Sequence, residues 1–315
     1  MSSPALVLLL GFWFAQPDAA NLRELFEQNL ARSEHAYGMA DARTAAAARD
    51  LGLFLRGQND APGAYRALSE AVEIDGKSLG ADNGQTMEDI ASLAVVAPPQ
   101  ESESLWRHAA EGANASVASK AWAALGEIRE RAGDPKGAAE MYAKALRKGE
   151  AASGKDSAET AVRLNALALV SEPRDAVPLL ERAVAIDRQR WGEKHPETAT
   201  AESNLSGELL AAGRVPEAVR LGAQALRNFE ATLGPEHPRT AAAASNLADA
   251  KRAAGDRAGA EALYRRALSI DEQAYGASNP ETLNDVKNLA DFLREIGRDR
   301  DARELERRYS STAPH

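Results

Sequence analysis

The residues best suited to acid–base or metal chemistry are two histidines, His195 and His237, each directly followed by proline. Imidazole titrates near neutral pH and is the commonest metal ligand, so a catalytic or metal site is one interpretation of this pair. The sequence motif around each histidine recurs along the chain, at intervals of 42 residues between its clearest copies, and the equivalent positions carry Asp41, Asn83, Ser157 and Asn279. All of these residues are typical N-caps of α-helices, and proline favours the first helical position that follows. A ligand or base would not be exchanged for Ser or Asn, so we expect helix caps and no catalytic residue, metal site or cofactor.

The recurring motif indicates an internal repeat. Its clearest copies occupy residues 191–198, 233–240 and 275–282 and read WGEKHPET, LGPEHPRT and YGASNPET. The same spacing extends back to residues 79–86 and 37–44, and shorter copies lie near residue 116 and at residues 153–160. A fixed period of this length is typical of repeat proteins built from stacked supersecondary units. The sequence therefore predicts about seven units.

Each unit has the pattern of two α-helices. In the unit after Thr240, a first helix with Leu247 on its apolar face is predicted to stop at Gly255, because glycine readily adopts the left-handed conformation at a helix C-terminus. A second helix follows, with apolar residues three and four positions apart, and continues to Tyr275. Alternation of apolar and polar residues, typical of strands, is lacking in the sequence. The predicted fold class is all-α.

Several residues make these units similar to the tetratricopeptide repeat (TPR), in the long form found in kinesin light chain. The third unit carries Trp122, Leu125, Gly126, Ala138, Tyr142 and Ala145 at the family's packing positions. The long-form pattern of His-Pro followed by Asn-Leu occurs at residues 195–205 and 237–247. The resemblance covers residues 21–309 and is strongest over 116–309; it is weakest in the second unit, where Pro98-Pro99 should end the first helix early. It implies a right-handed α–α superhelix of about seven helix–turn–helix repeats, with a concave wall of first helices.

Three asparagines, Asn204, Asn246 and Asn288, recur at intervals of 42 residues, one position before the packing leucine of each first helix. In TPR proteins this position faces the concave groove and often hydrogen-bonds the backbone of a bound peptide. An amide suits that role because it offers both a donor and an acceptor. The alternative is that the amides only satisfy a neighbouring helix. Both interpretations stay open.

Charged residues continue along the same predicted face. They are Asp249, Asp291, Arg252 and Arg294, with Lys287 beside Asn288. A groove with cations toward its C-terminal end would suit an acidic segment or a chain-terminal carboxylate. Paired Asp–Arg bridges between adjacent repeats would explain the same residues equally well.

Composition limits the remaining functions. The formal net charge of −9 opposes binding to nucleic acid, and the lack of cysteine excludes disulfides and thiolate chemistry. Residues 1–20 are interpreted as a signal peptide, because residues 4–15 form an apolar run too short to span a membrane. The alternatives are an apolar N-terminal helix and a cytoplasmic protein. With cleavage we expect an exported protein, periplasmic or secreted, without a stable membrane span. Residues 310–315 are expected to be a disordered tail, and the abundance of alanine suggests a bacterial source.

The predicted function follows from the resemblance. We expect a protein–protein interaction scaffold, not an enzyme, that binds a peptide or partner protein in its concave groove. The alternative is a structural component that assembles by stacking through its repeat ends, without a peptide ligand.

Overall fold

The computed structural model describes residues 19–310, and over this range its regular secondary structure consists of fifteen α-helices. The all-α prediction is confirmed. Most of the predicted signal peptide, residues 1–18, and residues 311–315 of the predicted tail lie outside the described residues. Among residues 19–310, no helix combines the length and apolar character that a membrane span requires. Export stays a prediction, which N-terminal sequencing of the mature protein would check.

The helices form seven consecutive pairs, which confirms the predicted repeat number. The first helices are α2 (Ala42–Gly57), α4 (Gly84–Val96), α6 (Ala115–Arg131), α8 (Ala158–Leu169), α10 (Pro196–Ala211), α12 (Pro238–Ala253) and α14 (Pro280–Glu295). The second helices are α3 (Ala61–Ser78), α5 (Pro99–Glu111), α7 (Pro135–Ser153), α9 (Pro173–Trp191), α11 (Val215–Thr232), α13 (Arg257–Tyr275) and α15 (Asp299–Ser310). An additional helix, α1 (Ala19–Tyr37), precedes the first pair and packs on α2.

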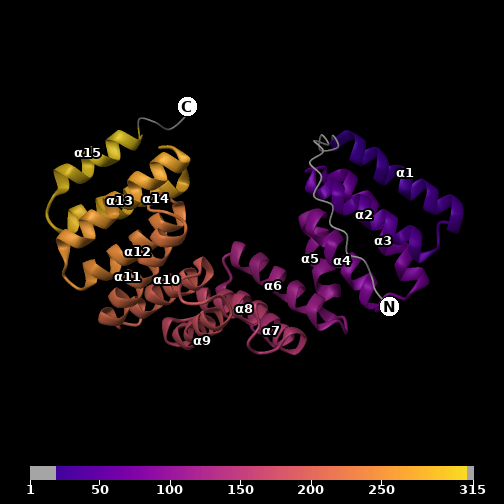
Figure 1. Ribbon diagram of the computed structural model, residues 1–315, viewed down its shortest axis with the longest axis horizontal. Helices are drawn as coiled ribbons and strands as arrows, with labels where there is room; N and C mark the ends of the chain where they lie inside the picture. The colour runs from indigo at the N-terminus through magenta and orange to yellow at the C-terminus, as the bar shows by residue number, and fades with distance from the viewer. Residues whose placement is uncertain (1–18, 311–315) are drawn as a thin grey trace, which may run out of the picture. The chain divides into compact units, whose positions relative to one another are not determined.

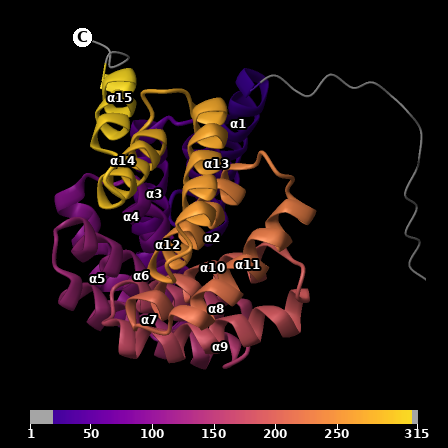
Figure 2. The ribbon, with the colours of Figure 1, turned by 90° about the vertical axis from the view of Figure 1, so that its left-hand side faces the viewer.

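Contacts divide the chain into two compact units, Met1–Leu125 and Gly126–His315. In unit 1, each helix from α1 to α4 packs on the next helix in the sequence (Figure 1). In unit 2, the same holds from α7 to α14, and the first helices α10 and α12 also touch each other. Figure 2 shows the last pairs of this unit, α12 with α13 and α14 with α15, from a second direction. Stability in such an array comes from contacts between sequence neighbours.

The recurring sequence motif has a defined structural role at the turn between successive pairs. At six turns, a glycine adopts positive φ at the end of a second helix or of α1, and its carbonyl accepts a hydrogen bond from a threonine six residues later. The donors Thr44, Thr86, Thr160, Thr198, Thr240 and Thr282 bond to Gly38, Gly80, Gly154, Gly192, Gly234 and Gly276 at 2.7 to 2.9 Å. All six threonines are buried. We call this arrangement the Gly–Thr turn; the satisfied carbonyl is one of those that a helix end leaves without a partner.

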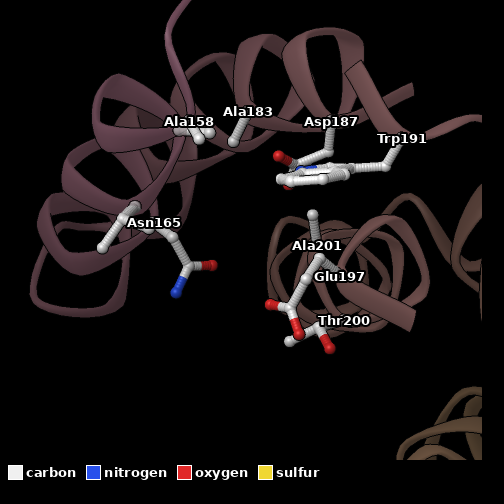
Figure 3. Close-up of a pocket in the computed structure, with 10 residues that line it drawn as sticks. Ala158, Asn165, Ala183, Asp187, Trp191, Glu197, Thr200 and Ala201 are labelled. Atoms are coloured by element: carbon white, nitrogen blue, oxygen red, sulfur yellow. The ribbon is translucent and has the colours of Figure 1, made fainter. Parts of the chain in front are cut away.

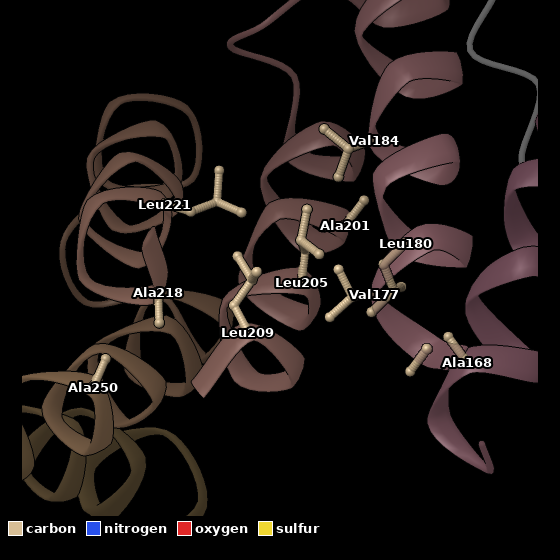
Figure 4. Close-up of a cluster of buried hydrophobic side chains, with 11 residues drawn as sticks. Ala168, Val177, Leu180, Val184, Ala201, Leu205, Leu209, Ala218, Leu221 and Ala250 are labelled. Carbon is tan, nitrogen blue, oxygen red and sulfur yellow. The ribbon is translucent and has the colours of Figure 1, made fainter. Parts of the chain in front are cut away.

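The core consists of leucines that pack against small residues of neighbouring helices. Leu205 and Leu209 of α10 pack with Leu180 of α9 and Leu221 of α11 (Figure 4). Alanine in the facing positions lets the helices approach closely. The interpretation of Gly126 as a close-packing residue is confirmed, because a Cβ atom there would lie 2.6 Å from the Tyr142 ring.

The second pair departs from the regular pattern, as expected from Pro98-Pro99. Helix α4 ends at Val96, and α5, which starts at Pro99, has 13 residues where α3 has 18. Proline cannot donate the backbone hydrogen bond that would continue α4, so the helix stops before it.

Candidate functional site

The histidines that could have carried chemistry are helix caps, as predicted. Nδ1 of His195 accepts a hydrogen bond from the backbone N–H of Glu197 at 3.2 Å, and Nδ1 of His237 accepts one from Arg239 at 3.0 Å. The equivalent Asn279 accepts from Glu281 through its side-chain oxygen at 2.9 Å. Within residues 19–310, no three His, Asp or Glu side chains are grouped in a way that could hold a metal ion.

Asn204, Asn246 and Asn288, which we call the asparagine ladder, occupy equivalent, half-buried positions on α10, α12 and α14. Each is followed by a buried leucine. Nδ2 of Asn204 donates to Oδ1 of Asn165 on α8 at 2.7 Å, and Nδ2 of Asn246 donates to the Ser203 hydroxyl on α10 at 3.0 Å. These two amides therefore link consecutive first helices. Asn288 makes no hydrogen bond to another residue of the described range.

These two hydrogen bonds leave part of each amide's hydrogen-bonding capacity unused. A primary amide has two N–H donors and a carbonyl acceptor, and each of the two bonds uses one N–H. Asn204 and Asn246 each keep one N–H and the side-chain oxygen without a partner among residues 19–310. Peptide binding by the ladder stays a prediction.

Most of the predicted groove charges are engaged within the protein. Asp249 accepts a hydrogen bond from the Tyr264 hydroxyl, and burial together with this carboxylate raises the pKa of Tyr264 above its usual range. Arg252 pairs with Glu295 of α14. Arg294 binds Asp291 at 3.0 Å and Glu306 of α15 at 2.5 Å. Lys287 is exposed and has no ion-pair partner in the described part of the chain. The Arg252–Glu295 pair joins adjacent repeats, but through a glutamate and not through the predicted aspartate.

Sequence reasoning missed a pocket of about 240 Å³ between the first helices α8 and α10, with α9 as its third wall (Figure 3). Its lining is mostly apolar and includes the exposed side chains of Val162 and Trp191, which are 59% and 47% accessible. Asn165 lies on the α8 side, whereas Asp187 and Trp191 enter from α9 (Figure 3). Burial, and secondarily the nearby Glu197, raise the pKa of Asp187. The only signal in the sequence was an aspartate placed five residues before the glycine of a Gly–Thr turn.

Comparison with known families agrees with the repeat geometry. One model described as "Tetratricopeptide repeat" matches residues 171–231, 197–273 and 240–314, and a second model with the same description matches residues 121–152. The chain belongs to the tetratricopeptide repeat family. Proteins of this TPR family are in general scaffolds without enzymatic activity. No curated protein matches the sequence.

Solved structures with this TPR fold are distant in sequence. A Rap protein complexed with Competence and Sporulation Factor is 16% identical, with a TM-score of 0.59, over 85% of this chain and 76% of that one. BtubC (BKLC) from P. vanneervenii is 19% identical, with a TM-score of 0.52, over 78% of this chain and 88% of that one. A Podosopora anserina putative kinesin light chain repeat structure is 21% identical over 73% of this chain and 95% of that one, with a TM-score of 0.42. At these identities, the similarity to the first two concerns the fold.

Proposed function

We propose that this TPR protein is a protein-interaction scaffold that binds an extended segment of a partner along the first helices α8, α10, α12 and α14 of unit 2. The observation that carries the proposal is the alignment of Asn204, Asn246 and Asn288 at one position of three successive first helices. Packed helices are about 8–10 Å apart. An extended peptide that crosses them would therefore meet one amide about every three residues.

The remaining polar atoms of the ladder fit the backbone of such a peptide. The unused N–H and oxygen of Asn204 and Asn246 can pair with a peptide carbonyl and N–H, whatever the peptide's side chains are. Asn288 has its whole amide available within the described structure. Backbone recognition would supply affinity without a strict sequence requirement.

The exposed residues beside the ladder change in character along the unit. On α8, Val162 and Leu169 are exposed at 59% and 57%. On α14 the exposed residues, apart from Pro280 and Leu283, are polar or charged and include Asn284 and Lys287. The segment we propose therefore presents aliphatic side-chain groups to α8 and is mainly polar, with an acidic group, where it meets α14. The Rap protein named above was solved with a bound factor, which is consistent with ligand binding by this fold.

Panning a random dodecapeptide phage library against the full chain, and then measuring the affinity of the recovered peptides, tests the proposal. Asn288→Ala should weaken binding several-fold without lowering Tm, because this side chain makes no hydrogen bond in the described structure. Asn246→Ala should weaken binding too, with a small loss of stability. Ser203→Ala is the matched control, because it breaks the same inter-helix bond but keeps the Asn246 amide.

Two results would contradict the proposal. One is a failure to recover any peptide that binds; the other is unchanged affinity in both asparagine variants. If Ser203→Ala weakened binding as much as Asn246→Ala does, the Asn246 amide would support binding only by stabilising the fold and not by contacting the peptide. Light scattering across concentration tests the assembly alternative, because a monomer at all concentrations leaves that alternative without support.

A further inference from the structure

The chain contains a three-helix junction that recurs with different residues. It joins a first helix, its second helix and the next first helix, and its positions are fixed by the Gly–Thr turns. The position on the first helix lies five residues after the threonine of its Gly–Thr turn. The position on the second helix lies five residues before the glycine of the next turn, and the position on the next first helix lies three residues after that turn's threonine. They are occupied by Arg49, Asp75 and Asp89 in unit 1, and by Asn165, Asp187 and Ala201 at α8–α9–α10.

In unit 1 this junction holds a guanidinium group. Nη2 of Arg49 lies 2.7 Å from an Asp75 carboxylate oxygen and 3.1 Å from one of Asp89, and Nε of Arg49 binds the other Asp89 oxygen. Both carboxylates are buried, at 1% and 0% exposure. A charge-assisted pair of this bidentate kind is strong and directional. The geometry of the junction is therefore suited to a guanidinium placed between α2, α3 and α4.

At α8–α9–α10 the aspartate of the second helix remains, but the arginine is replaced by Asn165 and the second carboxylate by Ala201. Both replacements are shorter, and the pocket described above lies at this junction. Asp187 makes no hydrogen bond or ion pair with any residue between 19 and 310. Arg190 is the nearby cation, the imidazole of His195 also lies nearby, and Glu197 is the nearby negative group. Glu197 is half exposed and pairs with Arg239 at 2.9 Å.

The other junctions of unit 2 are filled from within the chain. At α10–α11–α12 the three positions are Ser203, Phe229 and Ala243, and Phe229 is buried in an apolar cluster. At α12–α13–α14 they are Ser245, Asp271 and Asp285, all of them buried. Of these three junctions of unit 2, only the one at α8–α9–α10 combines an acid with open space.

We propose that this pocket binds the guanidinium group of an arginine side chain carried by the partner segment, with Asp187 as its counter-ion. The inference rests on the proposed function only in assigning the arginine to the partner segment. Binding of a guanidinium group by the pocket does not depend on it. Guanidinium only donates hydrogen bonds. The carboxylates of Asp187 and Glu197 and the hydroxyl oxygen of Thr200 are acceptors at the pocket. The aliphatic part of the arginine would pack on Val162 and Trp191, as long cationic side chains do on apolar surfaces.

A small probe tests the pocket independently of any partner. N-acetyl-arginine methylamide is titrated into the full chain while the indole N–H of Trp191 is followed by NMR, with the signal assigned through Trp191→Phe. We expect a saturable shift, at least about tenfold weaker affinity for the neutral citrulline analogue, and weaker affinity for the lysine analogue. Asp187→Asn should abolish binding, whereas Asp175→Asn, an exposed carboxylate on the same helix, should leave it unchanged.

A gain-of-contact variant provides a second test. Asn165→Arg restores the residue found at the unit 1 junction and should close the pocket, raise Tm and abolish binding of the probe. The inference is overturned if arginine and citrulline shift the indole signal equally, if lysine binds as well as arginine, or if Asp187→Asn binds undiminished. Peptides recovered from the phage library without enrichment of arginine would also overturn it while leaving the proposed function intact. A library that yields no peptide would contradict the proposed function. Titration with the small probe would still show whether the pocket binds a guanidinium group.

Discussion

Asp285 of α14 and Asp271 of α13 are neighbouring carboxyl groups, both buried, and one oxygen of each has no hydrogen-bond partner among residues 19–310. Burial, reinforced by the charge of Asp271, raises the pKa of Asp285 to about 7. The arginine that neutralises the equivalent pair in unit 1 is replaced here by Ser245, whose hydroxyl lies 3.4 Å from Asp285. One carboxyl of the pair therefore keeps its proton well above the usual range.

This pair should make the protein less stable as the pH rises. Because the pKa of Asp285 is higher in the folded than in the unfolded state, the folded state binds more protons between about pH 4 and 7. Its contribution to the free energy of unfolding is present at low pH and is lost as the pH rises through 7. Asp285→Asn should therefore raise Tm at pH 8 and have little effect at pH 4.5. Thermal unfolding of both proteins across this range checks the prediction; an equal Tm difference at all pH values would contradict it.

Removal of Arg49 should have the opposite effect to Asp285→Asn, because it should lower the stability of the protein at high pH. Arg49→Ser reproduces the arrangement of the C-terminal pair and leaves Asp75 and Asp89 buried without a cation. Removing one partner of a buried ion pair costs about 3–5 kcal/mol. We expect a large loss of stability at pH 8 that shrinks toward pH 5 as a carboxyl takes up a proton. The double variant Arg49→Ser with Asp89→Asn should recover part of the loss, as measured by urea unfolding; no recovery would argue against a charge effect.

Two glycines inside helices make a matched pair for testing close packing. Gly126→Ala would place a methyl group 2.6 Å from the buried Tyr142 ring, whose hydroxyl is also held by Glu130 at 2.9 Å. We expect destabilisation of about 1–3 kcal/mol. By contrast, no atom lies within 4 Å of a Cβ at Gly207 of α10, so this glycine is not a close-packing residue. Gly207→Ala should stabilise the protein by about 0.5–1 kcal/mol through helix propensity. Equal effects in chemical unfolding would refute the distinction.

The Gly–Thr turn predicts the effect of losing one hydroxyl. Thr240→Val keeps the shape of the side chain but removes the donor to the Gly234 carbonyl, which it contacts at 2.8 Å. Since Thr240 is fully buried, we expect a loss of about 1–2 kcal/mol. Thr200→Val is the control, because this half-buried hydroxyl bonds only within its own helix, to Pro196. A similar loss in the control would remove any special role of the turn.

Periodicity predicted the helices and their ends but not the contacts across helices. The equivalence of His195 with Asn279 was enough to predict the caps, because capping depends on residues two or three positions away in sequence. The partner of Asn204 is 39 residues distant, and no sequence rule identifies it as Asn165. Spacing likewise placed Arg252 on the correct helix but not beside Glu295. The pocket escaped notice because it depends on two side chains being shorter than their equivalents elsewhere in the chain.

The Gly–Thr turn also bears on how such a chain changes in length. Its hydrogen bond closes within six residues, and each helix from α7 to α15 contacts its neighbours in sequence. A duplicated 42-residue segment would therefore include its own Gly–Thr hydrogen bond. Duplication or loss of one such segment would create a junction of a kind already present. We therefore expect this architecture to accept added whole segments, whereas an insertion inside a turn would break the bond that sets the start of the next pair.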